Sequence, residues 1–256
     1  MLPYVRIGRL YAGSQNYSTA DRKFQEGLAI DSTYGPLYKE EADMNFNRAR
    51  YQAGYDYYVK YMALVDTTPD IRYKHSLYLV LLNKYKEAIP GLEKLKQENY
   101  PNPALYRLLA YSYFETNNID AAEASMKQFT NSEPKPTLLV RDYEYQGKIY
   151  YKKGNDSLGT AMFLKVIELD TNRTDLYSNI ADQYYASKNY DKAIAYYELK
   201  IKKSRKANAQ DYLSLGKCYY FQTDYVKADT VFSQLIALRP EEPQGYKWRA
   251  RVQEKN

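Results

Sequence analysis

The sequence predicts an all-α fold, an α-α superhelix of seven helix-turn-helix repeats followed by one helix of a partial eighth repeat. Three observations lead to this prediction. The sequence repeats every 34 to 37 residues, two positions of every repeat hold only small residues, and no stretch reads as a β-strand. We expect one continuous solenoid domain over residues 1–256, with repeats that begin near residues 1, 35, 69, 103, 140, 174 and 209 and a last helix at 243–254.

Small residues at two positions define the repeat. When positions are numbered from the start of each repeat, positions 8 and 20 hold only Gly, Ala or Ser. Packed helices lie about 8–10 Å apart, and a large side chain at their crossing point would separate them. We therefore predict that each repeat is a pair of antiparallel helices that cross at these positions. The residues are Gly8, Ala42, Ser76, Ala110, Gly147, Ala181 and Gly216 at position 8, and Ala20, Gly54, Ala88, Ala122, Gly159, Ala193 and Ala228 at position 20.

The starts of the helices and the turns follow the same period. Pro36, Pro69 and Pro103 fall at the starts of the second, third and fourth repeats, where the first turn of a helix tolerates proline. Short polar turns separate the two helices of a repeat, namely GSQNY (13–17), KGNDS (153–157), SKNY (187–190) and QTDY (222–225). The last stretch, PQGYKWRARVQEKN, has Tyr246 at position 4 and Ala250 at position 8, so it predicts a first helix without its partner.

Neither end of the chain carries a separate polar cap, which solenoids need to cover their end repeats. Position 4 of the first repeat is already Tyr4, and Trp248 in the last predicted helix calls for a packing partner. We expect a fragment of a longer repeat protein, with self-association through its unfinished ends as a further expectation.

Composition and motifs argue against catalysis. The net charge of +6 is spread without a dense basic face, so we expect no nucleic-acid partner. A single cysteine, Cys218, excludes an intramolecular disulfide, and with the single histidine, His75, it provides too few ligands for a zinc site. The chain contains neither a glycine-rich phosphate loop nor an apolar run long enough to span a membrane. We therefore predict a non-catalytic protein without cofactor or metal, in which Cys218 and His75 are packing residues.

One basic segment leaves two interpretations open. KIKKSRKA (200–207) closes the second helix of the sixth repeat. Its cations complement the negative end of the helix dipole, and a patch for an acidic partner is the alternative.

The stretch Tyr212–Pro240 shows the repeat most clearly. Its pattern, Tyr-x2-Leu-Gly-x2-Tyr…Ala-x3-Phe…Pro, resembles the signature of the tetratricopeptide repeat (TPR) family. The resemblance extends from Tyr4 to about Gln253. It weakens in the second repeat, where Glu41 replaces the usual Leu, and in the third, where Arg72 and His75 replace the aromatic residue and the Leu.

This resemblance implies a right-handed superhelix that serves as a protein–protein interaction scaffold and binds a peptide or partner protein in a concave groove lined by the first helices. The Tyr-, Asn- and Lys-rich repeats resemble bacterial TPR proteins of the cell envelope, which favours the periplasmic side, with the cytoplasm as the alternative. The sequence does not identify the partner.

In this family, ligands commonly contact positions 2, 5, 9, 12 and 13 of the first helices. Here position 12 forms an aromatic ladder flanked by mixed charges, which suits an extended peptide or a partner helix. The predicted partner-binding residues are Lys39, Asp43, Phe46, Arg107, Tyr111, Phe114, Lys148, Tyr151, Asp182, Tyr185, Lys217 and Tyr220.

Two alternatives remain open for the same groove. It could be occupied by another domain of the same protein in a larger assembly, or its tyrosines could form a carbohydrate-binding surface.

Overall fold

The computed structural model describes residues 1–204 and 208–255, and these residues form fifteen α-helices and no β-strand. The all-α prediction of seven helix pairs and one final helix is confirmed. In chain order the helices are α1 (Leu2–Gly13), α2 (Tyr17–Ile30), α3 (Gly35–Asn47), α4 (Tyr51–Met62), α5 (Pro69–Leu81), α6 (Tyr85–Gln97), α7 (Ala104–Glu115), α8 (Ile119–Thr130), α9 (Val140–Lys152), α10 (Asp156–Leu169), α11 (Asp175–Ala186), α12 (Tyr190–Lys203), α13 (Ala209–Phe221), α14 (Tyr225–Leu238) and α15 (Pro243–Gln253).

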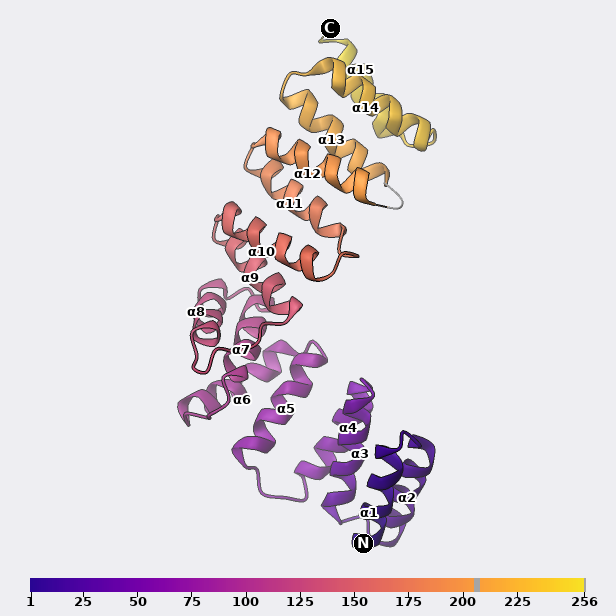
Figure 1. Ribbon diagram of the computed structural model, residues 1–256, viewed down its shortest axis with the longest axis vertical. Coiled ribbons are helices and arrows are strands. Elements are labelled where there is room, and N and C mark those ends of the chain that lie inside the picture. Colours follow the sequence, from indigo (N-terminus) through magenta and orange to yellow (C-terminus); the bar gives the residue numbers. More distant parts are fainter. Residues whose placement is uncertain (205–207, 256) are drawn as a thin grey trace. The chain divides into compact units, whose positions relative to one another are not determined.

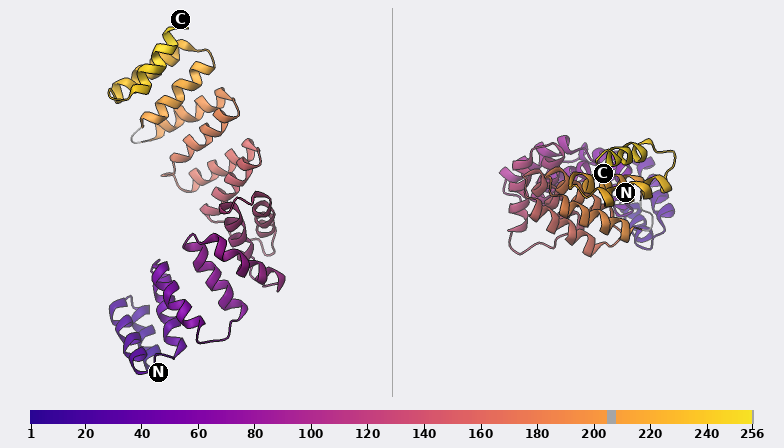
Figure 2. Two further views of the ribbon diagram at one scale, coloured as in Figure 1. Left: turned by 180° about the vertical axis from the view of Figure 1, so that it is seen from behind. Right: turned by 90° about the horizontal axis from the view of Figure 1, so that it is seen from above.

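The chain divides into two compact units, which are described separately. Unit 1 runs from Met1 to Pro136 and holds α1–α8, and unit 2 begins at Thr137 and holds α9–α15. A single continuous domain over 1–256 stays a prediction. Within each unit the two helices of a repeat pack against each other, and the second helix packs against the first helix of the next repeat (Figure 1). Each unit is therefore a solenoid of stacked helix pairs, and the same order of pairs can be followed from behind in Figure 2.

The alternation of helices creates two surfaces. First helices touch each other across repeats, as α1 touches α3, α5 touches α7 and α13 touches α15. We call the surface that the first helices form in each unit the first-helix face, and the surface that the second helices form the second-helix face.

The seven turns between the helices of a pair share one backbone conformation. The residue at position 15 is left-handed in each, with φ between 55° and 74°, although only Gly154 is a glycine. The amide of this residue and the amide that follows it both donate back to the preceding helix, as when Gln15 donates to the carbonyl of Ala12 at 3.0 Å and Asn16 donates to the carbonyl of Tyr11 at 2.9 Å. The Asn16 side chain then accepts from the amide of Thr19 and caps the second helix. This turn fixes each pair as antiparallel.

Glycine at position 8 is matched to phenylalanine at position 24. A β-carbon on Gly8, Gly147 or Gly216 would collide with the ring of the phenylalanine sixteen residues later in the chain. Repeats with Ala or Ser at position 8 carry no Phe at position 24. The pairs are Gly8–Phe24, Gly147–Phe163 and Gly216–Phe232 on one side, and Ala42–Tyr58, Ser76–Leu92, Ala110–Met126 and Ala181–Tyr197 on the other.

Two of the three departures from the repeat pattern, Glu41 and His75, lie partly or fully buried in unit 1. Glu41 is fully buried, and one of its carboxylate oxygens accepts from the Gln25 amide at 2.8 Å. His75 is half-buried and stacks on the ring of Tyr55 with centroids 5.6 Å apart. Burial lowers the pKa of His75, and the nearby Glu87 opposes this effect. His75 is thus a packed residue, as predicted.

The basic segment 200–207 is described only in part. Helix α12 ends at Lys203, with Lys200, Lys202 and Lys203 in its last turn, where cations favour the negative end of the helix dipole. Arg205 and Lys206 lie outside the described residues.

Candidate functional site

Ion pairs link neighbouring first helices of unit 1. The Arg9 guanidinium on α1 pairs with Glu40 on α3, and the Lys74 ammonium on α5 pairs with Asp43 on α3. Asp43 also accepts from Lys39 at 2.9 Å. Burial alone would raise the pKa of Asp43, but the hydrogen bonds from Lys39 and Lys74 outweigh it and lower the pKa below its ordinary value. The predicted residues Lys39 and Asp43 thus lie together in a charged seam across the first-helix face.

Phe46 is held at the turn end of α3. Its ring lies edge-on to Tyr51 at 5.7 Å and to Tyr78 at 5.4 Å, and the Lys74 ammonium lies 5.2 Å from its centroid. The ring is half-buried, so Phe46 presents only part of its surface.

The three predicted residues of α7 differ in exposure. The Arg107 guanidinium lies 4.4 Å from the centroid of Phe129, and both Arg107 and Phe114 are half-buried. Tyr111 is only 3% exposed. Its ring belongs to the core of unit 1 and offers almost no surface to a partner.

In unit 2, the Lys148 ammonium pairs with Glu144 at 2.7 Å, and Arg173 pairs with the other oxygen of Glu144 at 2.9 Å. Burial would raise the pKa of Glu144, but these two hydrogen bonds lower it. The Lys148 ammonium also lies 5.2 Å from the centroid of Tyr145. Lys148 is therefore a fixed cation on α9.

Tyr151 joins the two helices of the fifth repeat. Its ring lies edge-on to Phe163 at 5.2 Å, and its hydroxyl shares a hydrogen bond of 2.9 Å with Thr160. The absence of a side chain at Gly159 makes room for this ring. Burial raises the pKa of Tyr151. These contacts give Tyr151 a structural role in addition to its place at position 12.

Six aromatic side chains of unit 2 contact one another, four on the first helices α11, α13 and α15 and two at the starts of the second helices α12 and α14, and we call them the aromatic cluster. They come from α11 to α15 and are Tyr185, Tyr190, Tyr220, Phe221, Tyr225 and Trp248. Phe221 lies at the centre, because its ring stacks on Tyr190 at 5.7 Å and lies edge-on to Tyr220 at 5.6 Å. It is also 45% exposed. The cluster thus combines a fixed position with accessible ring surface.

Charged groups border the aromatic cluster. The Lys217 ammonium lies 5.4 Å from the Trp248 ring, and the Arg251 guanidinium lies 4.7 Å from it. Asp182 is exposed on α11 and accepts a hydrogen bond from Tyr197. The structure therefore brings Tyr185, Lys217 and Tyr220 together around Phe221.

The sequence prediction missed Phe221, Tyr190 and Trp248. Phe221 occupies position 13, which the family resemblance also implies for ligand contact, but the predicted set took residues only from positions 5, 9 and 12. Position 13 was therefore the available signal. The importance of Phe221 depends on Tyr190 and Trp248, which come from the repeats on either side.

Fixed aromatic rings can bind apolar or aromatic side chains, and the flanking cations can bind carboxylates, without any covalent bond being formed. Cys218 does not add a nucleophile, because it is fully buried and burial together with Asp182 raises its pKa to about 12. Among the described residues no group of histidine, cysteine and acidic side chains could hold a metal ion. The described helices also include none with the length and apolar character required to cross a membrane.

Comparison with known proteins identifies similar chains. Profiles of the tetratricopeptide repeat family match residues 103–136, 174–202 and 212–241. The crystal structure of the C-terminal part of a TPR repeat-containing protein from Cytophaga hutchinsonii is 33% identical, with a TM-score of 0.59 over 70% of this chain and 69% of that chain. No curated protein matches the chain.

Two further crystal structures support the fold alone. A tetratricopeptide repeat protein from Parabacteroides merdae is 14% identical, with a TM-score of 0.59 over 98% of both chains. YrrB, described as a TPR protein with an unusual peptide-binding site, is 19% identical, with a TM-score of 0.53 over 66% of this chain and 86% of that chain.

Proposed function

Because the chain belongs to the tetratricopeptide repeat family, whose repeats form protein-interaction scaffolds, we propose that its first-helix face binds a peptide or an extended segment of a partner protein. In each unit the proposed surface comprises the predicted residues of that unit's own first helices that are accessible, and in unit 2 it also includes the aromatic cluster.

The aromatic cluster carries this proposal. Phe221 is 45% exposed although its ring contacts Tyr185, Tyr190 and Tyr220. A large ring that is held in place loses little side-chain entropy when a partner covers it, so it contributes more affinity than a mobile one. Lys217 beside it supplies a cation for a carboxylate of the ligand.

Ion pairs on first helices of both units support a role in specificity. Lys39, Asp43 and Lys148 each have a partner within the chain. A ligand group that replaced one partner of an ion pair would need the charge of the group it replaces, in the same position. A ligand with the opposite charge there would be repelled. Tyr151 contributes by holding α9, which carries Lys148, against α10.

The test uses a peptide-display library selected on the wild-type protein, followed by calorimetric titration of the selected peptides. We expect Phe221→Ala and Lys217→Ala to weaken binding by roughly tenfold or more, which corresponds to about 1.4 kcal/mol. The matched control is Val226→Ala on α14, a side chain that is 74% exposed and lies outside the cluster. Tyr151 is left unchanged because its loss would disturb the helix pair.

Circular dichroism confirms that each variant keeps its helices. If the selected peptides bind Phe221→Ala and Lys217→Ala as tightly as they bind Val226→Ala, the first-helix face of unit 2 is not the binding surface.

One observation favours a carbohydrate as a second candidate ligand. Tyr190 of the aromatic cluster also borders a polar hollow of about 470 Å³, which Asn189, Asp191 and Gln222 line. Sugars stack on aromatic rings and hydrogen-bond to amide and carboxylate groups. Binding on a glycan array that disappears in Tyr190→Ala would support this candidate, and an array without signal would reject it.

A further inference from the structure

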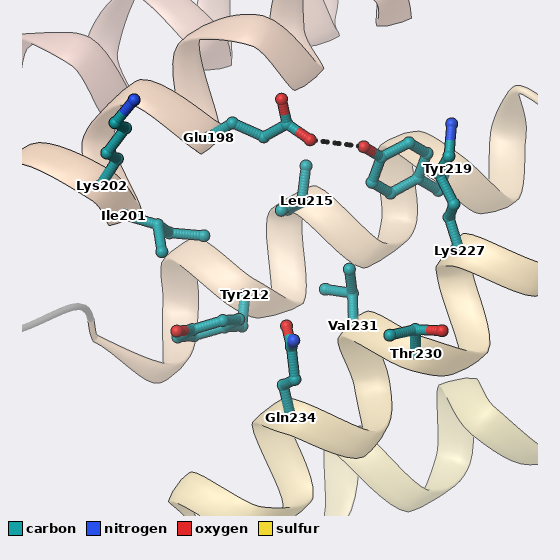
Figure 3. Close-up of a pocket in the computed structure, with 10 residues that line it drawn as sticks. All are labelled: Glu198, Ile201, Lys202, Tyr212, Leu215, Tyr219, Lys227, Thr230, Val231 and Gln234. Atoms are coloured by element: carbon teal, nitrogen blue, oxygen red, sulfur yellow. Dashed lines mark hydrogen bonds between the residues drawn. The ribbon is translucent and has the colours of Figure 1, made fainter.

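A hollow on the second-helix face of unit 2 is separate from the aromatic cluster. It has a volume of about 390 Å³ and lies between α12 and α14, with α13 as its floor (Figure 3). Leu215 and Val231 provide an apolar base, and the ring of Tyr219 forms part of the wall. Ligand pockets of about 300–1,000 Å³ are typical, so the hollow can hold a side chain or a small group.

The preceding repeat shows what is missing from this hollow. In the sixth repeat, position 23 is Tyr196, whose ring stacks on Tyr184 at position 11, with centroids 5.9 Å and planes 7° apart. In the seventh repeat, position 11 is Tyr219 but position 23 is Val231, and both line the hollow. Because Val231 is smaller than tyrosine, the ring of Tyr219 lacks the stacking partner that Tyr196 provides for Tyr184.

Cations lie on both sides of this space. Figure 3 shows Lys202 on one side and Lys227 on the other, and the Lys227 ammonium lies 5.3 Å from the centroid of Tyr219. Lys202 belongs to the basic last turn of α12. The only carboxylate among the lining residues, Glu198, accepts a hydrogen bond of 2.6 Å from the Tyr219 hydroxyl. The Lys227 ammonium also pairs with the Asp224 carboxylate at 3.0 Å, so a ligand carboxylate on that side would join an existing ion pair, and Lys202 supplies the second cation of the rim.

We propose that this hollow is a second peptide-docking site, which takes one aromatic side chain of an acidic peptide. The ring lies against Tyr219, as Tyr196 lies against Tyr184, and carboxylates on either side of it pair with Lys202 and Lys227. The ring supplies buried apolar area and the carboxylates supply orientation. This site lies on the second-helix face, so it does not depend on ligand binding at the first-helix face.

The test measures fluorescence polarisation of a labelled synthetic peptide that has one phenylalanine flanked by glutamates. Two matched peptides replace the phenylalanine by alanine or the glutamates by lysines. The alanine peptide lacks the ring that fills the hollow, and the lysine peptide brings cations beside Lys202 and Lys227, so we expect both matched peptides to bind at least roughly tenfold more weakly. Equal binding of the phenylalanine and alanine peptides overturns the proposal.

Variants locate the site. Val231→Tyr places in the hollow the ring that the sixth repeat already has, and we expect it to weaken binding at least tenfold. Val226→Tyr is the control, because it makes the same exchange on an exposed part of the same helix. Undiminished binding by a folded Val231→Tyr protein overturns the proposal.

If Val231→Tyr loses its helical dichroism, Lys202→Glu decides instead, since Lys202 is exposed and its exchange leaves the core intact. Tenfold weaker binding supports the site, and unchanged binding overturns it. Phe221→Ala distinguishes the two faces, because it should leave this peptide bound even if the proposed function is wrong.

Discussion

Replacing Gly216 by alanine should destabilise unit 2, although alanine favours helices. A β-carbon at this position would lie 2.5 Å from Cε1 and 2.8 Å from Cζ of Phe232. Carbon atoms make their best contacts at about 3.5–4.0 Å, so the ring or the helix must move. Phe232 is fully buried, and the Trp248 ring stacks on it at 6.0 Å, which leaves it little space.

Two opposing effects set the magnitude. Alanine gains about 1 kcal/mol over glycine inside a helix. Overpacking a well-filled core costs about 1–3 kcal/mol. The collision here involves three ring atoms of one rigid side chain, which places the cost near the upper end of that range. We therefore expect a net loss of ~1–2 kcal/mol in the free energy of unfolding. Phe232→Leu in the same chain should restore part of this loss, because it removes the ring atoms that collide, and the repeats with Ser76 and Ala110 at position 8 carry the aliphatic residues Leu92 and Met126 at position 24.

Urea unfolding followed by the fluorescence of Trp248 measures the effect locally, since this is the only tryptophan and it touches Phe232. A local probe is needed because solenoids do not always unfold as one unit. Gly13→Ala is the control, as a β-carbon there would meet nothing within 4 Å; because Gly13 lies in unit 1, its stability is followed by circular dichroism. The reasoning fails if Gly216→Ala is as stable as the wild type, or if the double variant is no more stable than the value expected from adding the two single changes.

Three further predictions concern stability. Thr223→Gly should raise the unfolding free energy by about 1 kcal/mol, because Thr223 is a β-branched residue held at φ of 66°. Gly154→Ala should lower the unfolding free energy, because alanine would be forced to adopt φ of 74°. Thermal unfolding measures both, and changes of the opposite sign would contradict the account of the turns. Burial raises the pKa of Glu41 to about 8, above its ordinary value of 4.5, so its contribution to stability is fully present below pH 4.5 and is lost as the pH rises through about 8. Glu41→Gln should therefore stabilise unit 1 by ~1–3 kcal/mol at alkaline pH and flatten its pH dependence, which urea titrations at several pH values test; an unchanged pH profile would exclude Glu41 as its source. Tyr151→Phe should lower the free energy of unfolding by about 1 kcal/mol, because the hydrogen bond to Thr160 is lost, and should leave ligand affinity unchanged. A loss of affinity with unchanged stability would instead assign Tyr151 to ligand contact.

The helix pairs could be predicted because the two helices of every repeat pack against each other in the same way and need the same residue types at the same positions. Small residues at positions 8 and 20 and polar residues at the turns are local requirements, and each can be read without knowing the neighbours. The positive φ at position 15 was not predicted, since Ala49, Lys188 and Thr223 carry no signal for it. The backbone adopts it there because the helix must end and reverse within two residues.

The candidate site was predicted less completely. Repeat position indicates which helix carries a side chain and roughly where on that helix it lies. Exposure depends on side chains from other repeats. Tyr111 and Tyr220 occupy equally favourable positions in the sequence, yet Tyr111 lies in the core and Tyr220 joins an accessible cluster.

The sequence by itself determined the period, the all-α class, the helix pairs and the family resemblance, because these depend on residue types at fixed spacing within one repeat. Only the tertiary structure decided which aromatic rings gather around Phe221 and which space Val231 leaves open beside Tyr219. Both features arise where side chains of two or three repeats meet. The size of such a gap and the exposure of such a ring depend on the side chains of the adjacent repeats, so neither can be read from the sequence of one repeat.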